Sequence, residues 1–426
     1  MLIEFNVTNF RSFQETQTLS MAANNATELR NENTFNSGIK GLPHFLHSAV
    51  IYGPNAAGKS NLLLALHFMK SFVLSSANDG QQGKKIKVTP FLFHPQTNTQ
   101  PCEFEVLFIQ NSVRYQYGFA VTDERVTHEW LFAYPEKRAQ RWFEREYDFY
   151  SQQENWHFGS KLKGHRQIWK EATRSNALFL STAIQLNSEQ LKPVFDWFLE
   201  KLKIGKSAEI NPINTLQKCE TESKKQQILE FMNAADLSIA DIQLKTRKFS
   251  LKNEHHDVLQ KLTVEIKSDN GKAEVELTET KVQLFHSVIG KIQKSIPLDL
   301  QEESDGTQRL FEFAGIWLKA LDEGSVLGID ELESSLHPKL VQFLIDLFHN
   351  PDMNKKHAQL IFTTHDTTVQ DSFRRDQIWF VEKNEGNATQ LYPLSDFSPR
   401  KKEARQKGYL NGRYGALPYV KKLRRS

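Results

Sequence analysis

The stretch of sequence that decides the fold is Gly53-Pro54-Asn55-Ala56-Ala57-Gly58-Lys59-Ser60. It matches the pattern G-x-x-x-x-G-K-[ST] in full, and it follows the apolar run Ser48–Tyr52 and opens a helix expected to reach about Met69. Glycine lets such a loop wrap so that its N–H groups point at phosphate oxygens, and the helix N-terminus adds partial positive charge. We therefore expect the loop to bind the phosphates of ATP, with Lys59 at the β- and γ-phosphates and the Ser60 hydroxyl on Mg²⁺.

A second apolar run, Val326-Leu327-Gly328-Ile329, ends in the paired carboxylates Asp330 and Glu331. Because α/β sheets bind ligands at the carboxyl ends of their strands, we expect this pair to face the same phosphates. Asp330 would hold Mg²⁺, directly or through water, and Glu331 would polarise the attacking water as general base. An apolar strand that ends in Asp-Glu is common, so the phosphate loop is what gives the pair this interpretation.

Two further segments fit the same site. Thr363-Thr364-His365-Asp366 follows another apolar run and suits a histidine that contacts the γ-phosphate, with an ordinary loop histidine as the alternative. Ser304-Asp305-Gly306-Thr307 stands at the start of a helix, where hydroxyl and backbone N–H groups bind anions. Its alternative is a helix cap, since Ser304 and Asp305 both cap well. The order of the four segments along the chain favours the functional interpretation.

That order resembles the ABC ATPases, and within them the SMC/RecF-like branch. The resemblance implies that Ser304 and Gly306 bind the γ-phosphate of the opposite subunit, so that ATP is hydrolysed by a homodimer or a higher oligomer. Asn9-Phe10-Arg11 looks like the N-F-R segment of SMC-type heads, which implies that Arg11 contacts nucleotide. Ser335 takes the place of the D-loop residue. For the glutamine that senses Mg²⁺ the candidate is Gln185, with an ordinary surface position as the alternative.

A narrower resemblance is to the RloA-like ATPases of bacterial anti-phage (abortive-infection) systems, which are related to the overcoming-lysogenization-defect (OLD) group. It rests on four segments of the final third of the chain: Glu303–Thr307, Ser335–Pro338, Arg374–Trp379 and Gly412–Pro418. OLD proteins carry a TOPRIM nuclease after the head. The acidic residues after His365 do not form its pattern, so the resemblance implies a separately encoded effector protein.

We expect an α/β fold: an ABC/SMC-like P-loop ATPase head, with a mixed sheet plus an antiparallel meander, and a mostly helical insert. Residues 1–150 would form the N-terminal lobe and 296–426 the C-terminal lobe. Between them, residues 151–295 would form a helical insert with a β-hairpin that turns at Asp269-Asn270-Gly271. Because about 270 residues separate Lys59 from Asp330, both lobes must build one site.

Composition excludes several other classes. Hydrophobic residues make up 39% and charged residues 25%, as in soluble globular proteins, and the net charge of +3 permits a nucleic-acid partner without arguing for one. The cysteines, Cys102 and Cys219, do not form a disulfide framework or a thiolate metal site. No signal peptide opens the chain and no run approaches 18 apolar residues, so we expect a cytoplasmic protein without a membrane partner.

The sequence suggests four functions, of which two are disfavoured. The leading hypothesis is a dimeric ATPase that regulates a partner effector, a nuclease or toxin, in phage defence. The alternative is a RecF/SMC-like DNA-repair or DNA-binding ATPase. A transporter subunit is disfavoured because the signature is Ser-Asp-Gly-Thr instead of Leu-Ser-Gly-Gly-Gln, and a nuclease is disfavoured because a second carboxylate cluster is missing from the sequence.

Overall fold

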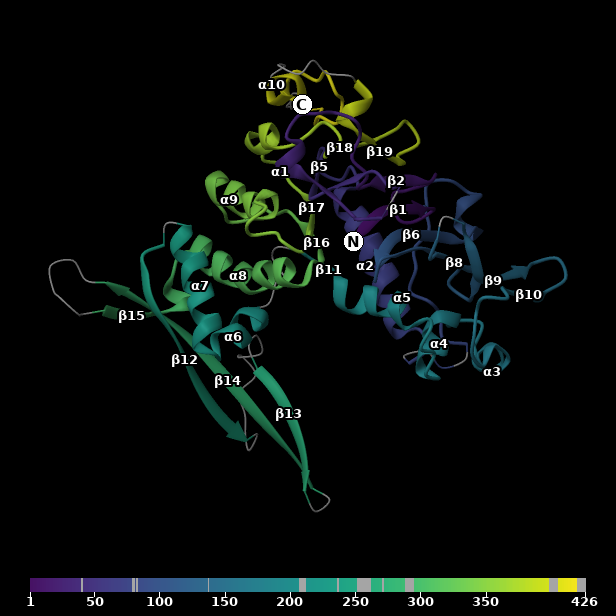
Figure 1. Ribbon diagram of the computed structural model, residues 1–426, viewed down its shortest axis with the longest axis horizontal. Coiled ribbons are helices and arrows are strands. Elements are labelled where there is room, and N and C mark those ends of the chain that lie inside the picture. The colour runs from purple at the N-terminus through teal and green to yellow at the C-terminus, as the bar shows by residue number, and fades with distance from the viewer. Residues whose placement is uncertain are drawn as a thin grey trace, which may run out of the picture. The chain divides into compact units, whose positions relative to one another are not determined.

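A mixed six-stranded sheet carries the phosphate loop at its centre (Figure 1). The order of its strands is β11 (Leu202–Lys206), β16 (Val326–Asp330), β17 (Gln359–Thr363), β5 (Ser48–Tyr52), β18 (Ile378–Lys383) and β19 (Thr389–Pro393). All neighbours pair in parallel except β18 and the edge strand β19. β5, β16 and β17 are buried at every position, as in sheets covered on both faces. Their carboxyl ends lie side by side at one edge of the sheet.

The antiparallel meander is the second sheet. Its strand order is β10 (Gln153–Phe158), β9 (Gln140–Asp148), β8 (Val126–Tyr134), β7 (Val113–Val121), β6 (Cys102–Gln110), β1 (Leu2–Thr8) and β2 (Gln17–Ser20). Alternate residues of β6 are buried, which gives the sheet one apolar face. The turn between β6 and β7 places Asn111 and Ser112 at φ 51° and 61°, the left-handed pair of a tight hairpin.

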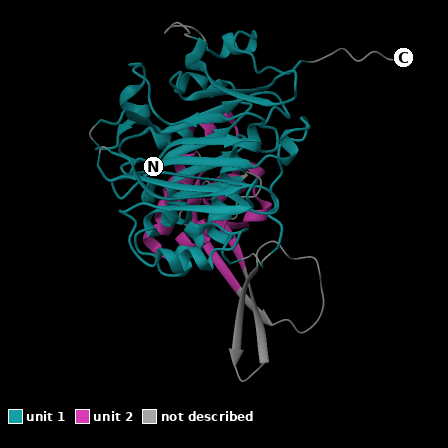
Figure 2. Cartoon of the chain, turned by 90° about the vertical axis from the view of Figure 1, so that its right-hand side faces the viewer, with its two compact units in different colours: residues 1–209, 320–334, 344–426 teal, residues 210–319, 335–343 magenta. Residues whose placement is uncertain are grey.

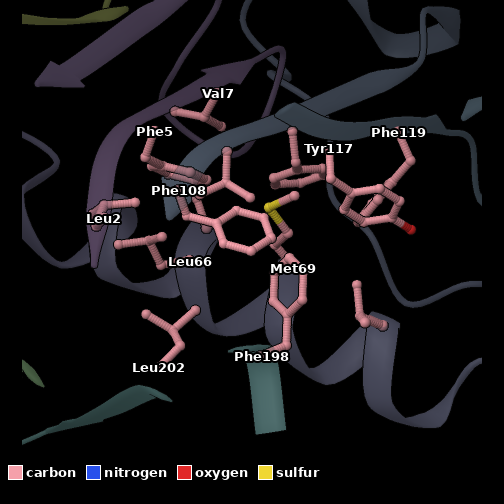
Figure 3. Close-up of a cluster of buried hydrophobic side chains, with 14 of the residues drawn as sticks. Leu2, Phe5, Val7, Leu66, Met69, Phe108, Tyr117, Phe119, Phe198 and Leu202 are labelled. Carbon is pink, nitrogen blue, oxygen red and sulfur yellow. The ribbon is translucent and has the colours of Figure 1, made fainter. Parts of the chain in front are cut away.

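Helix α2 (Lys59–Ser75) packs against apolar residues of both sheets. Leu66 and Met69 of α2 meet side chains of the meander, and Phe198 and Leu202 close the cluster (Figure 3). Apolar residues occur on most sides of α2, which is typical of a helix buried inside a domain. The core therefore fixes the position of the helix that begins at Lys59.

The computed structural model describes residues 1–39, 41–78, 81, 83–136, 138–206, 212–235, 237–250, 262–269, 272–287, 295–397 and 405–419. The chain divides into two compact units (Figure 2). Unit 1 comprises residues 1–209, 320–334 and 344–426, and unit 2 comprises residues 210–319 and 335–343. None of the helices in the described ranges combines the length and the hydropathy needed to span a lipid bilayer.

Unit 1 contains both sheets and several short elements. These are α1 (Arg30–Asn33), β3 (Thr34–Asn36), β4 (His44–Leu46), η1 (Thr97–Thr99), α3 (Arg166–Ala172), α4 (Phe179–Gln185), α5 (Lys192–Asp196), the π-helical turn η2 (Trp197–Lys201), η5 (Thr368–Ser372), η6 (Leu394–Phe397) and α10 (Arg405–Leu410). The chain passes between the units within α8 (Asp305–Glu323) and α9 (Pro338–His349).

Unit 2 is built on a long antiparallel sheet. Its strands are β12 (Ile239–Ser250), β14 (Lys272–Ser287) and β13 (Leu262–Asp269), with β15 (Ser295–Asp299) paired to β14. It also contains α6 (Ile213–Cys219), α7 (Glu222–Ala234), η4 (Leu300–Glu302) and the start of α8. Gly315 of α8 allows α6 to approach closely, since a Cβ atom there would lie 2.3 Å from the backbone nitrogen of Thr215.

The expected α/β class, a mixed sheet beside an antiparallel meander, is confirmed, and so is the hairpin of β13 and β14. Two turn residues of that hairpin, Asn270 and Gly271, lie outside the described residues. The expected boundaries of 1–150, 151–295 and 296–426 need revision. Residues 151–209 fold with the head because β11 joins the central sheet, and the signature helix begins in unit 2. The described part of the remaining insert contains four strands besides its helices.

Candidate functional site

The phosphate loop leaves β5 and turns sharply into α2. Ala56 and Gly58 have φ angles of 62° and 116°, a conformation that suits glycine at position 58. A Cβ atom on Gly58 would lie 2.3 Å from Oγ1 of Thr389 on β19, and that hydroxyl donates to the carbonyl oxygen of Ala57 at 2.6 Å. The loop is therefore held in its wrapped form by the neighbouring hairpin of β18 and β19.

Lys59 lies in the concavity of this loop and is buried. Its ammonium group donates to the carbonyl oxygens of Gly53 at 2.8 Å and Pro54 at 3.3 Å, and lies 3.1 Å from Nε2 of His365. Burial lowers the pKa of Lys59 below its ordinary value, and the nearby negative charges of Glu333, Asp330 and Glu331 oppose that shift. These carboxylates help to keep a cation where phosphate oxygens are expected to bind.

Asp330 and Glu331 end β16 beside β17, as the sequence predicts. The hydroxyl of Thr363 donates to Oδ1 of Asp330 at 2.7 Å and accepts the backbone N–H of Glu331 at 2.8 Å. Asp330 is buried, whereas Glu331 is exposed and has a φ of 56°. A non-glycine residue held in the left-handed region is typical of functional turns. One carboxylate is thus fixed within the sheet edge while the next projects toward solvent.

Glu333 is a site residue that the sequence patterns do not single out. Its Oε1 atom accepts the backbone N–H of His365 at 2.6 Å. Its Oε2 atom is buried and finds no hydrogen-bond donor among the described residues. Glu333 also has the largest of the charge effects that raise the pKa of Lys59. The only signal in the sequence was its place two residues after Glu331, which does not reveal where the side chain points.

His365 follows β17 and is exposed apart from its contact with Lys59. If Lys59 donates to Nε2, that nitrogen is unprotonated in this arrangement. The loop after it is anchored at two points: Tyr52 donates to the carbonyl oxygen of Asp366 at 3.0 Å, and Gln406 of α10 donates to the Thr367 hydroxyl at 3.0 Å. The C-terminal segment therefore supports the histidine loop.

The donor set fits a Mg²⁺ ion that shares its coordination with phosphate. Ser60 contributes a half-buried hydroxyl in the first turn of α2, and Asp330 contributes a carboxylate on the adjoining strands. Within the described ranges there is no group of three or more His, Cys, Asp or Glu side chains that could hold a metal by itself. Mg²⁺ with nucleotide needs one or two protein oxygens and takes its other ligands from phosphate and water.

Arg11 lies in a tight turn attached to the phosphate-binding helix. Asn9 and Arg11 both have positive φ, at 50° and 52°, and the guanidinium of Arg11 is exposed. The hydroxyl of Ser12 accepts a hydrogen bond from Asn61 of α2 and pairs with the hydroxyl of Thr389, each at 2.8 Å. The structure thus brings the turn to the first turn of α2, and contact between Arg11 and nucleotide stays a prediction.

The signature lies in unit 2, at the start of α8. The hydroxyl of Ser304 accepts the backbone N–H of Thr307 at 3.2 Å, which is the helix cap that the sequence offered as the alternative. A Cβ atom on Gly306 would lie 3.3 Å from the carbonyl oxygen of Ser335, so these two segments lie together. Ser335 has a φ of 62° and is exposed. The cap uses the N–H of Thr307, whereas phosphate binding would use other donors of this segment. The cap therefore does not test the functional role.

Gln185 lies at the wrong end of α2 for a residue that senses Mg²⁺. Its exposed side chain donates to Asn78, which follows the C-terminal end of that helix. The phosphate loop precedes the other end, and a helix of 17 residues is about 25 Å long. The surface position that was its alternative describes it better.

A cleft of about 550 Å³ opens beside the phosphate loop in unit 1. The cleft is lined by Gly53, Pro54, Asn55, His365 and Thr367 and by the C-terminal residues Tyr409, Leu410, Leu417, Pro418 and Tyr419. The C-terminal residues of the cleft are held by contacts with β18: Tyr414 is buried against Phe380, and Ala416 donates its N–H to Glu382 at 2.8 Å. The segment Gly412–Pro418 therefore packs beside the loop.

A phosphate loop between a buried strand and a helix, with paired carboxylates and a histidine on the adjoining strands, defines a P-loop nucleotide-binding protein. The sequence matches the profile of a family described as "AAA domain, putative AbiEii toxin, Type IV TA system" over residues 48–371. Because this match spans more than half of the chain, the protein belongs to that family of AAA-type ATPases. No curated protein matches the sequence significantly.

Solved structures with a similar fold include two SMC heads. The SMC head domain from Thermotoga maritima is 12% identical, with 92% of this chain and 98% of that chain covered and a TM-score of 0.40. An SmcHead bound to the C-winged helix domain of ScpA is 12% identical, with 92% and 97% covered and a TM-score of 0.36. Similarity this distant adds nothing to the assignment.

Proposed function

We propose that the chain hydrolyses ATP as a homodimer and uses the cycle to regulate a separately encoded effector, a nuclease or toxin, in phage defence. The observation that carries the proposal is the arrangement of Lys59, His365, Asp330 and Glu331 at one edge of the central sheet. The family description names a toxin and a TA system, which supports an effector. The narrower relation to RloA-like and OLD-related ATPases, and a cytoplasmic location, belong to the same proposal.

The residues of unit 1 can each perform one part of the reaction. Lys59 would exchange the carbonyl oxygens of Gly53 and Pro54 for β- and γ-phosphate oxygens, because all these acceptors suit the same ammonium protons. Glu331, exposed at the end of β16, would accept a proton from the attacking water, and His365 would contact the γ-phosphate. Mg²⁺, held by Ser60 and Asp330, would neutralise phosphate charge when bound.

The signature supports the proposed dimer. Ser304 and Gly306 begin α8, a helix of 19 residues whose N-terminus suits an anion. They belong to a different unit from the phosphate loop, and we propose that they act on the γ-phosphate bound by a second copy. ATP would then favour a closed dimer through contacts made only in that state.

ATP binding and turnover of purified variants test the ATPase itself. Lys59→Ala should abolish tight ATP binding, since it removes the charge aimed at the terminal phosphates. Glu331→Gln should bind ATP like the wild type and hydrolyse it about 10²- to 10⁴-fold more slowly. Wild-type turnover in Glu331→Gln would show that the base is misassigned.

The RecF/SMC-like alternative predicts direct binding to DNA. Its affinity should then fall steeply with salt, because phosphate contacts release counterions. A steep salt slope for the purified wild type without any effector would favour this alternative over regulation of a partner.

A further inference from the structure

An exposed aromatic loop lies next to the Arg11 turn in unit 1. Phe93 and Leu92 are 67% and 60% exposed, whereas the neighbouring Phe91 is fully buried. A large ring in solvent has an energetic cost unless something covers it. The ring centroids of Phe91 and Phe93 lie 5.7 Å apart, so the buried ring supports the exposed one.

The loop is tied to the turn by hydrogen bonds from the Arg11 backbone and the Asn9 side chain. Arg11 donates its N–H to the carbonyl oxygen of Thr89 at 2.9 Å, and Phe91 donates its N–H to the side chain of Asn9 at 3.1 Å. The amide of Asn9 also donates to the carbonyl oxygens of Thr97 and Gln100, each at 2.9 Å. Asn9 is buried, so this connection is rigid.

The same turn is connected to the phosphate loop through Ser12, Asn61 and Thr389. Thr389 is the cross-strand partner of Lys383, whose ammonium group lies 5.9 Å from the ring centroid of Phe93. Both Lys383 and Arg11 are exposed. The Phe93 ring, with the Lys383 ammonium group beside it, and the exposed Arg11 are thus both tied to the segments around the start of α2.

We propose that Phe93 is the stacking platform for the nucleotide base, with Arg11 and Lys383 beside the ribose and α-phosphate. The proposal rests on the proposed function, because the occupant is the base of the same nucleoside triphosphate. A ring face and two cations recognise any flat heterocycle joined to phosphate. Stacking does not read the edges of a base, so ATP and GTP should depend on Phe93 to a similar extent.

Comparison of ATP with inorganic tripolyphosphate separates base from phosphate recognition. Phe93→Ala should weaken Mg-ATP and Mg-GTP about tenfold and leave Mg-tripolyphosphate unchanged, and Phe93→Trp should retain ATP affinity. Phe149→Ala, at a ring that is 61% exposed in the β9–β10 turn, is the matched control and should change neither affinity. Lys59→Ala should weaken both ligands.

Two other outcomes would overturn a proposal, and they are distinguishable. Wild-type ATP affinity in Phe93→Ala, or an equal loss for tripolyphosphate, would overturn the platform while leaving the proposed function in place. Binding of neither ligand by the wild type would overturn the proposed function, and the platform with it.

Discussion

Glu333 and His365 are joined by a 2.6 Å hydrogen bond from the histidine's backbone N–H to the carboxylate. The bond ties the turn that follows Asp330 and Glu331 to the loop that follows β17. The position of the proposed γ-phosphate sensor therefore depends on a residue that itself carries charge beside Lys59.

The first prediction concerns this bond. Glu333→Ala should lower the rate of ATP hydrolysis at saturation by about tenfold or more, because the His365 loop loses its anchor. Glu333→Gln keeps a carbonyl oxygen that can accept the same N–H, so it should retain most of the rate. ATP affinity should not fall in either variant, since a negative charge is removed from the phosphate site. Single-turnover rates and ATP affinities of both variants check this, and equal rate losses would point to charge instead of positioning.

The second prediction concerns the stability of the fold at acidic pH. Burial lowers the pKa of His47 to about 4 and that of His349 to about 3, both in unit 1. Unfolded histidines titrate near 6.5, so stability is present above that pH and is lost as the pH falls from 6.5 toward 4 and 3. The loss is about 1.4 kcal/mol per pH unit for each histidine. Denaturant unfolding between pH 7.5 and 4.5 measures it, and His349→Gln should flatten the dependence.

Sequence patterns predicted those elements whose apolar residues match their burial in the fold. The apolar run Ser48–Tyr52, expected before the phosphate loop, is the strand β5 with the same bounds. Its uninterrupted apolar character matches its burial at every position. The meeting of Lys59 with Asp330 and His365 was predictable as well, because parallel strands end at a common edge.

The features that were missed depend on tertiary contacts. Residues 192–206, expected within the helical insert, form α5, the turn η2 and β11, since Trp197 is fully buried and the chain then joins the central sheet beside β16. Glu333 reaches the backbone of His365 from a turn in which Glu331 has positive φ, and the sequence does not reveal that conformation. Gln185 was chosen from its place in the sequence, and that place says nothing of which end of α2 it meets.

The third prediction concerns the two-subunit site. If Ser304 and Gly306 act on the nucleotide of the other copy, Ser304→Arg and Lys59→Ala homodimers should each be inactive. Mixed together they should recover part of the activity, because a heterodimer keeps one complete composite site. Heterodimers are verified with two affinity tags before turnover is measured. Verified heterodimers without activity would argue against a shared site.

The last prediction concerns the partner and the surface it uses. Hydrolysis must change the population of a conformation that another molecule binds, since the cycle has no other product in the proposed role. We expect the effector to bind unit 2, and to bind Glu331→Gln with ATP differently from nucleotide-free protein.

Ile296 in β15 of unit 2 is 59% exposed, and Ile168 in α3 of unit 1 is 55% exposed. Ile296→Asp should therefore reduce capture of the effector encoded in the native locus severalfold, while Ile168→Asp should not. The measurement is a quantitative pull-down with wild type, Glu331→Gln and both isoleucine variants, and the two isoleucine variants are first checked for unchanged ATP turnover. Equal yields from all four would favour the DNA-acting alternative, because neither nucleotide state nor unit 2 would then control a partner.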